Sequence, residues 1–147
     1  MAVRYAFRTA LRAAAVSLLE DYREFAGIEL NVWVARPRSI NLPQAFIDAM
    51  HEEITYSGHL VQRVPTAEII VLHGLFDSKN AVDQADAFAD GFLDWVIDRY
   101  HSAGANTIAE VVEFEDIPAF VPDWLPPNEQ KTYYATRIAL EGFASTG

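Results

Sequence analysis

The chain has 147 residues, of which 51% are hydrophobic and 22% charged, a size and composition typical of one globular domain. A net charge of −10 argues against general nucleic-acid binding, because phosphate contacts depend on clustered Lys and Arg. The absence of cysteine excludes disulfides and fits assembly in a reducing cytoplasm. No apolar run reaches the roughly 18–20 residues of a membrane span. We therefore expect a single domain over residues 1–147 and no membrane partner.

The charge is distributed unevenly along the chain. Up to Ile40, six arginines stand against four carboxylates, which leaves +2 there and −12 for the remaining residues. Such polarity favours head-to-tail contacts between copies, in which a basic region of one copy meets an acidic region of the next. The basic candidates for this contact are Arg4, Arg8, Arg12, Arg36 and Arg38.

Residues 4–26 predict the first helix, which Gly27 is well placed to end. Its arginines and alanines resemble a targeting segment, but the same periodicity continues through Glu20 and Glu24, so we expect a helix of the mature fold. The predicted apolar face comprises Phe7, Leu11, Ala14 or Ala15, Leu18, Tyr22 and Phe25.

Two segments before residue 60 differ in how clearly they predict a strand. Residues 29–35 alternate polar and apolar, which predicts a strand with Leu30, Val32 and Val34 on one face. Trp33 points the other way, where we expect a helix, a loop or a partner to cover it. A connector with two prolines follows. Residues 46–56 fit helical and strand spacing about equally, so their pattern leaves both open.

Residues 66–75 form a nearly continuous apolar run, as expected of a central strand buried on both faces. Residues 80–103 then predict an amphipathic helix, with Asn80 as its N-cap and Gly104 at its end. Its second stripe is acidic, and we expect it to face solvent, a neighbour's arginines or a passage for DNA, in that order. The stripe comprises Asp83, Asp86, Asp90, Asp94 and Asp98.

Two further strands are predicted at residues 108–115 and 131–143, the first with Glu110, Glu113 and Glu115 on one side. The proline-rich residues 116–128 between them are expected to be irregular. They also contain Phe120, Trp124 and Leu125, which are too apolar for a solvated loop. Either this segment folds over the protein's own core with Trp124 as a plug, or it is an arm that anchors a neighbouring subunit.

The sequence contains no evident catalytic constellation. After His51-Glu52-Glu53 the second histidine of a zincin motif is missing, since residue 55 is Thr. His73 and Asp77 could both touch a metal, although a histidine with a backbone partner is the simpler interpretation. Nucleophile-elbow and phosphate-loop motifs are absent. We therefore expect no enzyme, cofactor or metal site.

Several stretches resemble a known family, the tail terminator proteins of long, non-contractile-tailed bacteriophages. They are HGLFDSKNAVDQADAFADGFLDWVIDRYHSAGANT from His73, VPDWLPPNEQKTYYATRIALEGF from Val121, and the N-terminal RTALRAAAVSLLEDY. The resemblance covers nearly the full length and is weakest between Arg36 and Arg63. It rests on the order of the segments, so it transfers no interface residue by position.

The resemblance implies an α+β fold with a sheet of about five mixed or antiparallel strands, two packed helices and the order α-β-β-β-α-β-β. Residues 46–56 would then be a strand. It also implies a virion protein of the tail neck, assembled in the host cytoplasm as a homo-hexameric ring. The implied partners are the tail tube protein, the head-side connector or stopper, and DNA as passing cargo. Alternatives are another neck protein, such as a head-completion or adaptor ring, a small-ligand-binding domain or an uncharacterised enzyme.

Overall fold

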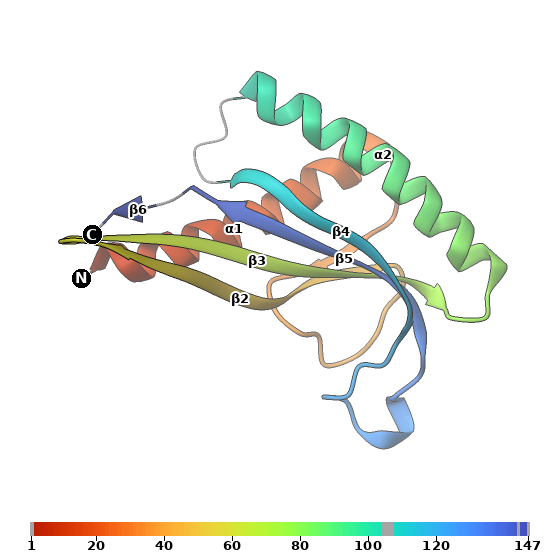
Figure 1. Cartoon of the computed structure of the whole chain (residues 1–147). Helices are drawn as coiled ribbons and strands as arrows, with labels where there is room; N and C mark the ends of the chain where they lie inside the picture. Colours follow the sequence, from red (N-terminus) through yellow and green to blue (C-terminus); the bar gives the residue numbers. More distant parts are fainter. Residues whose placement is uncertain (1, 104–107, 144, 147) are drawn as a thin grey trace.

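A twisted sheet carries both long helices on one of its faces (Figure 1). The computed structural model describes residues 2–103, 108–143 and 145–146, and the side chains of residues 8–97, 108 and 110–143. The elements are α1 (Ala2–Ala26), β1 (Asn31–Trp33), β2 (Gln44–Ser57), β3 (Leu60–Leu75), α2 (Lys79–Ala103), β4 (Ile108–Phe120), the 3-10 turn η1 (Pro127–Glu129), β5 (Tyr133–Gly142) and β6 (Ser145–Thr146). The expected α+β order is confirmed, with β6 as a short addition.

The strands follow the order β1-β2-β3-β5-β4, so that β3 is central and β1 and β4 form the two edges. β1 runs parallel to β2, whereas β2, β3, β5 and β4 pair antiparallel, and β6 adds a short antiparallel pairing to β3. Among the strands that the structure describes, β4 pairs with β5 alone. The sheet is therefore mixed. Its acidic strand, β4, lies at one edge.

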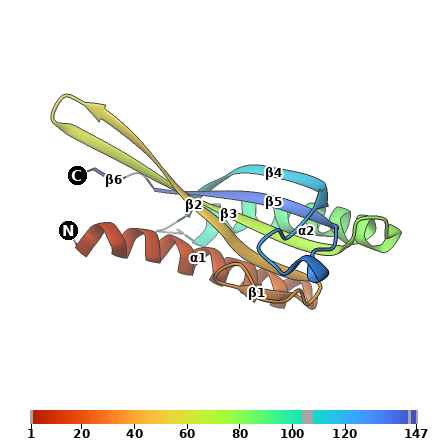
Figure 2. The same ribbon diagram turned by 90° about the horizontal axis from the view of Figure 1, so that it is seen from below.

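β2 and β3 form a hairpin that is much longer than the predicted strands. Residues 46–56, whose pattern fitted two structures, are strand, and β3 begins at Leu60 rather than at residue 66. Ser57 pairs with Leu60 across a turn in which Gly58 has a φ of +61°, a conformation that favours glycine. The far half of the hairpin diverges from the helices (Figure 2), and β6 pairs with it at Gln62 and Arg63.

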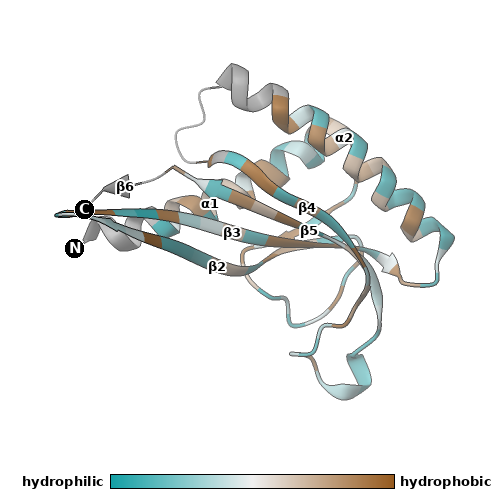
Figure 3. Cartoon of the chain, viewed as in Figure 1, coloured by the Kyte–Doolittle hydropathy of each residue, from teal (hydrophilic) through white to brown (hydrophobic). Residues whose placement is uncertain are grey.

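The sheet separates two apolar cores. The larger core lies between the helices and the sheet and includes Leu19, Phe92 and Leu140. The smaller core lies on the opposite face, around Phe46 and Leu72. α2 alternates apolar and polar segments along its length, as an amphipathic helix on a sheet should (Figure 3).

α1 ends where the sequence predicts. Gly27 has a φ of +65°, its N–H bonds the carbonyl of Glu24 at 3.3 Å, and the N–H of Ile28 bonds the carbonyl of Arg23 at 3.2 Å. This pair of bonds is the Schellman C-cap. The predicted apolar face is right for Leu11, Ala15, Leu18 and Tyr22 but wrong for Phe25, which is 70% exposed, and it missed the buried Leu19. The side chain of Phe7 lies outside the described residues.

Three local predictions need correction. α2 begins at Lys79, and the carbonyl of Ser78 accepts from the N–H groups of Ala81 and Val82, so Asn80 lies inside the helix and is not its cap. β4 continues through Pro118 to Phe120, because an edge strand tolerates a missing donor. Val34 lies beyond β1 and is exposed rather than buried beside Leu30. Gly104 lies outside the described residues.

Candidate interaction surfaces

Two of the basic candidates, Arg12 and Arg36, lie beside the β1 edge of the sheet. Arg12, in α1, donates from Nη1 to the carbonyl of Val34 at 3.3 Å, just past β1. Arg36 bonds Asp48 through Nε at 2.7 Å and so is partly neutralised. Arg8 and Arg38 are exposed. Arg4 lies in α1, but its side chain is outside the described residues.

The acidic candidates lie on the other side of the molecule. Glu110, Glu113 and Glu115 belong to β4, the opposite edge of the sheet. The predicted aspartate stripe of α2 is exposed at each of its four described positions, Asp83, Asp86, Asp90 and Asp94. Because α2 packs over β3, β5 and β4, this stripe adds negative charge on the β4 side. The β4 side is thus acidic, whereas the β1 side carries arginines beside Asp48 and Glu29.

Trp33 stays 46% exposed on β1, so no helix or loop of the described chain covers it fully. Coverage by a partner stays a prediction. Phe25 and Val34 are exposed as well, which leaves several large apolar side chains around β1 and the end of α1.

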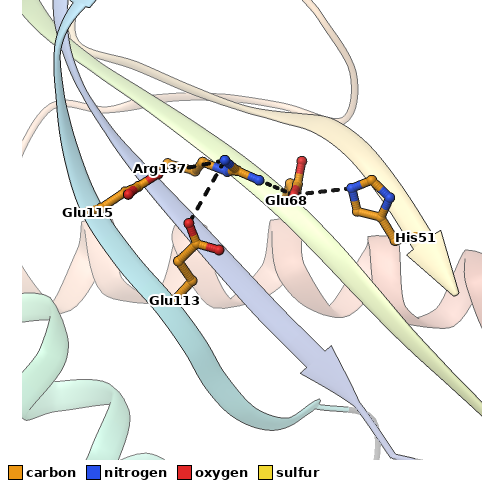
Figure 4. A network of polar contacts seen from close by, with 5 residues as sticks. All are labelled: His51, Glu68, Glu113, Glu115 and Arg137. Atoms are coloured by element: carbon orange, nitrogen blue, oxygen red, sulfur yellow. Dashed lines mark hydrogen bonds and ion pairs between the residues drawn. The ribbon is translucent and has the colours of Figure 1, made fainter. Parts of the chain in front are cut away.

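A polar network crosses the sheet face opposite the helices (Figure 4). Glu68 of β3 forms an ion pair with Arg137 of β5 and lies 3.1 Å from the imidazole of His51 of β2. Arg137 also approaches Glu115 at 3.6 Å and Glu113 at 3.9 Å. Two of the three β4 glutamates therefore face a cation of their own chain, and Glu110 is the more available acid.

The two central groups of this network, Glu68 and Arg137, stabilise each other's charged forms. Burial favours the neutral form of Glu68, but hydrogen bonds from Arg137 and His51 outweigh it and lower the pKa of the carboxyl. The hydrogen bond with Glu68 raises the pKa of Arg137. Sequence reasoning missed this network because it depends on the register that sets Glu68 and Arg137 side by side on the same face.

The proline-rich segment folds back onto the smaller core of its own chain. Leu125 is buried, and the ring of Trp124 packs edge-on against Phe46 with centroids 5.4 Å apart. The indole Nε1 donates to the carbonyl of Pro37 at 2.7 Å, and the Arg36 guanidinium lies 4.9 Å from the indole centroid. Phe120 packs against the same cluster. These contacts favour the plug over the arm, and a second role at a subunit interface stays a prediction.

A cavity of about 320 Å³ opens between the end of α1, the first half of α2 and β3. Its walls are mainly apolar, with polar groups from Glu29, Gln84 and His73. It is lined by Tyr22, Ile28, Glu29, Leu30, Pro43, Val71, His73, Gln84, Ala87 and Phe88.

His73 lies at this cavity with one nitrogen committed to the fold. Its Nε2 is 2.8 Å from the hydroxyl oxygen of Thr136, and both side chains are buried. Burial lowers the pKa of the imidazole to about 4, against a smaller opposing effect of Asp116, so the ring is neutral at pH 7. Asp77, the possible metal partner of His73, is exposed, and no three potential metal ligands gather among the described residues.

The structure also shows where the residues that resemble the start of a zincin motif, His51 and Glu52, lie. His51 and Glu52 are neighbours on β2, so their side chains point to opposite faces of the sheet. His51 faces Glu68, and Glu52 pairs with Arg63. The two residues therefore belong to separate polar contacts on opposite faces of the sheet.

The chain matches no model of a known protein family, and no curated protein matches it in sequence. Among the helices that the structure describes, none has the length and apolar character needed to cross a bilayer. The case for a function therefore rests on the surfaces above and on the resemblance of the sequence.

Proposed function

We propose that this protein is a tail terminator of a long, non-contractile-tailed bacteriophage. In this proposal six copies form a ring in the neck of the virion, which caps the last ring of the tail tube, stops its growth and joins it to the head-side connector. DNA passes through the ring without specific contacts. The sequence resemblance motivates the proposal, and the α+β order of the fold agrees with it.

The observation that carries the proposal is the separation of charge across the sheet. Arg12 and Arg36 lie beside the β1 edge, whereas the β4 edge carries Glu110 and its neighbours. Opposite edges of one subunit are thereby complementary, and a contact between unlike surfaces is heterologous, the type that generates closed rings. Each exposed pair contributes about 1 kcal/mol at most, so this complementarity orients the subunits more than it binds them.

The net charge also suits a conduit for DNA. A chain with a net charge of −10 repels phosphate, so a ring of such subunits would let DNA pass without holding it. Which acidic residues face the channel depends on how the copies are rotated in the ring. The α2 stripe and the β4 glutamates are the two candidates.

The deciding experiment measures assembly and capping separately. Native mass spectrometry should show six copies, and purified protein added to polymerising tail-tube subunits should end growth at a defined point. Phage lacking the protein should accumulate tubes of uncontrolled length. A chain that stays monomeric at every concentration and never binds tube ends would refute the proposal. A ring that binds only the head-side connector would instead identify an adaptor ring.

A further inference from the structure

The tip of the β2–β3 hairpin carries apolar side chains that the described part of the chain leaves exposed. Tyr56 is 74% exposed, Leu60 59% and Ile54 44%. Tyr56 pairs across the ribbon with Val61, and Ser57 pairs with Leu60. β6 pairs with β3 at Gln62 and Arg63, and the tip beyond this pairing, residues 56–61, has no third strand among those that the structure describes. A ribbon of two strands is only marginally stable by itself. An aromatic side chain held out on such a ribbon is suited to docking.

The His73 cavity offers a matching concave surface. Its volume of about 320 Å³ is near the lower end of small-molecule sites, which span roughly 300–1,000 Å³. An apolar cavity of about 150 Å³ suffices for one benzene ring. The cavity therefore has room for one phenol side chain, with apolar walls for the ring and Gln84, Glu29 and His73 for its hydroxyl.

The tip cannot reach the cavity of its own chain. β3 runs from Leu60 at the tip to His73 at the cavity, and at about 3.3 Å per strand residue the two lie roughly 40 Å apart. The tip extends away from the helices that form the cavity (Figure 2). Only another copy can bring the two surfaces together.

The charges of the two surfaces are compatible. Residues 54–62 contain no Asp, Glu, Lys or Arg in a chain of net charge −10, and their one imidazole is the exposed His59. The cavity rim carries Glu29, and the exposed Asp83 precedes Gln84 on α2. An acid-free tip that carries a histidine can approach this acidic rim without repulsion.

We propose that Tyr56 of one copy inserts into the His73 cavity of the next copy. The inference rests on the proposed function for the ring, and it names the contact that would hold neighbouring subunits together. Because the tip and the cavity are different surfaces, the contact is heterologous and repeats head to tail. Its core is an aromatic anchor in an apolar pocket, the arrangement that supplies most binding energy in protein interfaces.

Disulfide trapping tests the contact directly, because the chain has no cysteine of its own. The first chain carries Val61→Cys, which keeps Tyr56 and lies directly across the ribbon from it, and the second carries Ala87→Cys. The two chains are distinguished by tags of different mass, mixed and mildly oxidised. Ala87 is exposed and lines the cavity. A cross-link between the unlike chains is expected, since disulfides require Cα atoms about 4.4–6.8 Å apart. Thr55→Cys, on the other face of the ribbon, and Asp94→Cys, on α2 outside the cavity, are the controls and should not cross-link.

Substitutions test the energy of the same contact. Tyr56→Ala should raise the dissociation constant of the assembly roughly thirtyfold, as loss of an interface anchor does, and leave the melting temperature of the subunit unchanged. Ala87→Trp should block the cavity and have the same effect. Thr55→Ala and Ile97→Trp, an exposed position farther along α2, are the matched controls.

The outcomes separate this contact from the proposed function. A stable ring that caps tubes, forms no cross-link between unlike chains and tolerates Tyr56→Ala would overturn the contact and leave the terminator function intact. A specific cross-link in a protein that never binds tubes would support the contact and overturn the terminator function. If Ala87→Trp disrupts assembly while Tyr56→Ala does not, another segment occupies the cavity and the inference fails.

Discussion

The imidazole Nε2 of His73 lies 2.8 Å from the hydroxyl oxygen of Thr136, which joins β3 and β5 on the buried face of the sheet. Neutral imidazole can share this hydrogen bond in either direction, whereas the imidazolium would place a charge beside Phe88. Protonation in the folded state is therefore unfavourable.

We predict that His73 makes stability depend on pH between about 6.5 and 4. Burial lowers the folded-state pKa to about 4, so the unfolded chain binds more protons in this window and folding weakens as the pH falls. The full shift corresponds to about 3 kcal/mol. Urea unfolding midpoints at pH 7.5, 6.5, 5.5 and 4.5 should show the loss.

The control variants for this prediction are His73→Gln, which should abolish most of the slope, and His59→Gln, which should retain it because His59 is exposed. Measurements stop at pH 4.5 because the pKa of Glu68 is lowered, and its contribution is lost in more acidic solution. An identical slope in His73→Gln would show that other groups cause the dependence.

Gly91 allows the two helices to approach each other. A Cβ atom at this position would lie 2.4 Å from the hydroxyl oxygen of Tyr22, whose ring is held by Phe88 and Phe92. We expect Gly91→Ala to lower the free energy of unfolding by about 1–3 kcal/mol, despite the better helix propensity of Ala. Removing the hydroxyl with Tyr22→Phe should restore much of the loss. Thermal or urea unfolding of the single and double variants decides this, and additive losses would contradict the steric explanation.

Trp124→Ala and Trp33→Ala distinguish a core plug from an intersubunit arm. Trp124 packs on Phe46 and bonds Pro37, so we expect its truncation to destabilise the monomer by about 2 kcal/mol. Trp33 is half exposed on β1, so Trp33→Ala should lower the free energy of unfolding by less than about 1 kcal/mol. Unfolding curves measure the stability of each variant, and sedimentation measures its assembly. The arm interpretation wins instead if Trp124→Ala leaves stability intact and abolishes assembly.

Reversing charge on α1 tests the proposed contact between unlike edges. The double variant Arg8→Glu/Arg12→Glu should weaken the ring, because the reversed residues would repel the acidic edge of the next copy. Added salt should weaken the wild-type ring but strengthen the association of the variant, since it screens attraction in the first and repulsion in the second. Lys79→Glu/Lys131→Glu changes the net charge equally at two exposed sites and serves as the control. Equal effects of both variants on the mass distribution across salt concentrations would refute a specific role of α1.

Periodicity predicted the elements that have a clear apolar face. The run at residues 66–75 lies within β3, and the stripe of α2 buries Ala85, Phe88 and Phe92 as expected. The β2 pattern was ambiguous because the far half of its hairpin lacks a covering layer, so neither face of the ribbon is uniformly apolar. The prolines after residue 115 predicted too early an end for β4. The sequence does not show that β4 is an edge strand, in which Pro118 is tolerated.

Contacts between distant residues could not be predicted in this way. Glu68 and Arg137 meet only because Ile69 pairs with Ile138, a register set by packing across the whole sheet. The cavity arises where α1, α2 and β3 converge, and its lining residues lie between Tyr22 and Phe88 in sequence. The sequence did indicate that His73 belongs to a buried strand, which is the one signal that pointed to this site.

The strand order has a consequence for synthesis on the ribosome. β3 pairs with its neighbour β2 across a short turn, but its other side waits for β5, which begins at Tyr133. β4 emerges earlier and has no partner until that same strand arrives. Since pairings between distant segments form slowly, the nascent chain carries an unpaired strand edge until β5 has been made. The acids of β4 and its Pro118 would then act first as protection against aggregation, before any subunit meets another.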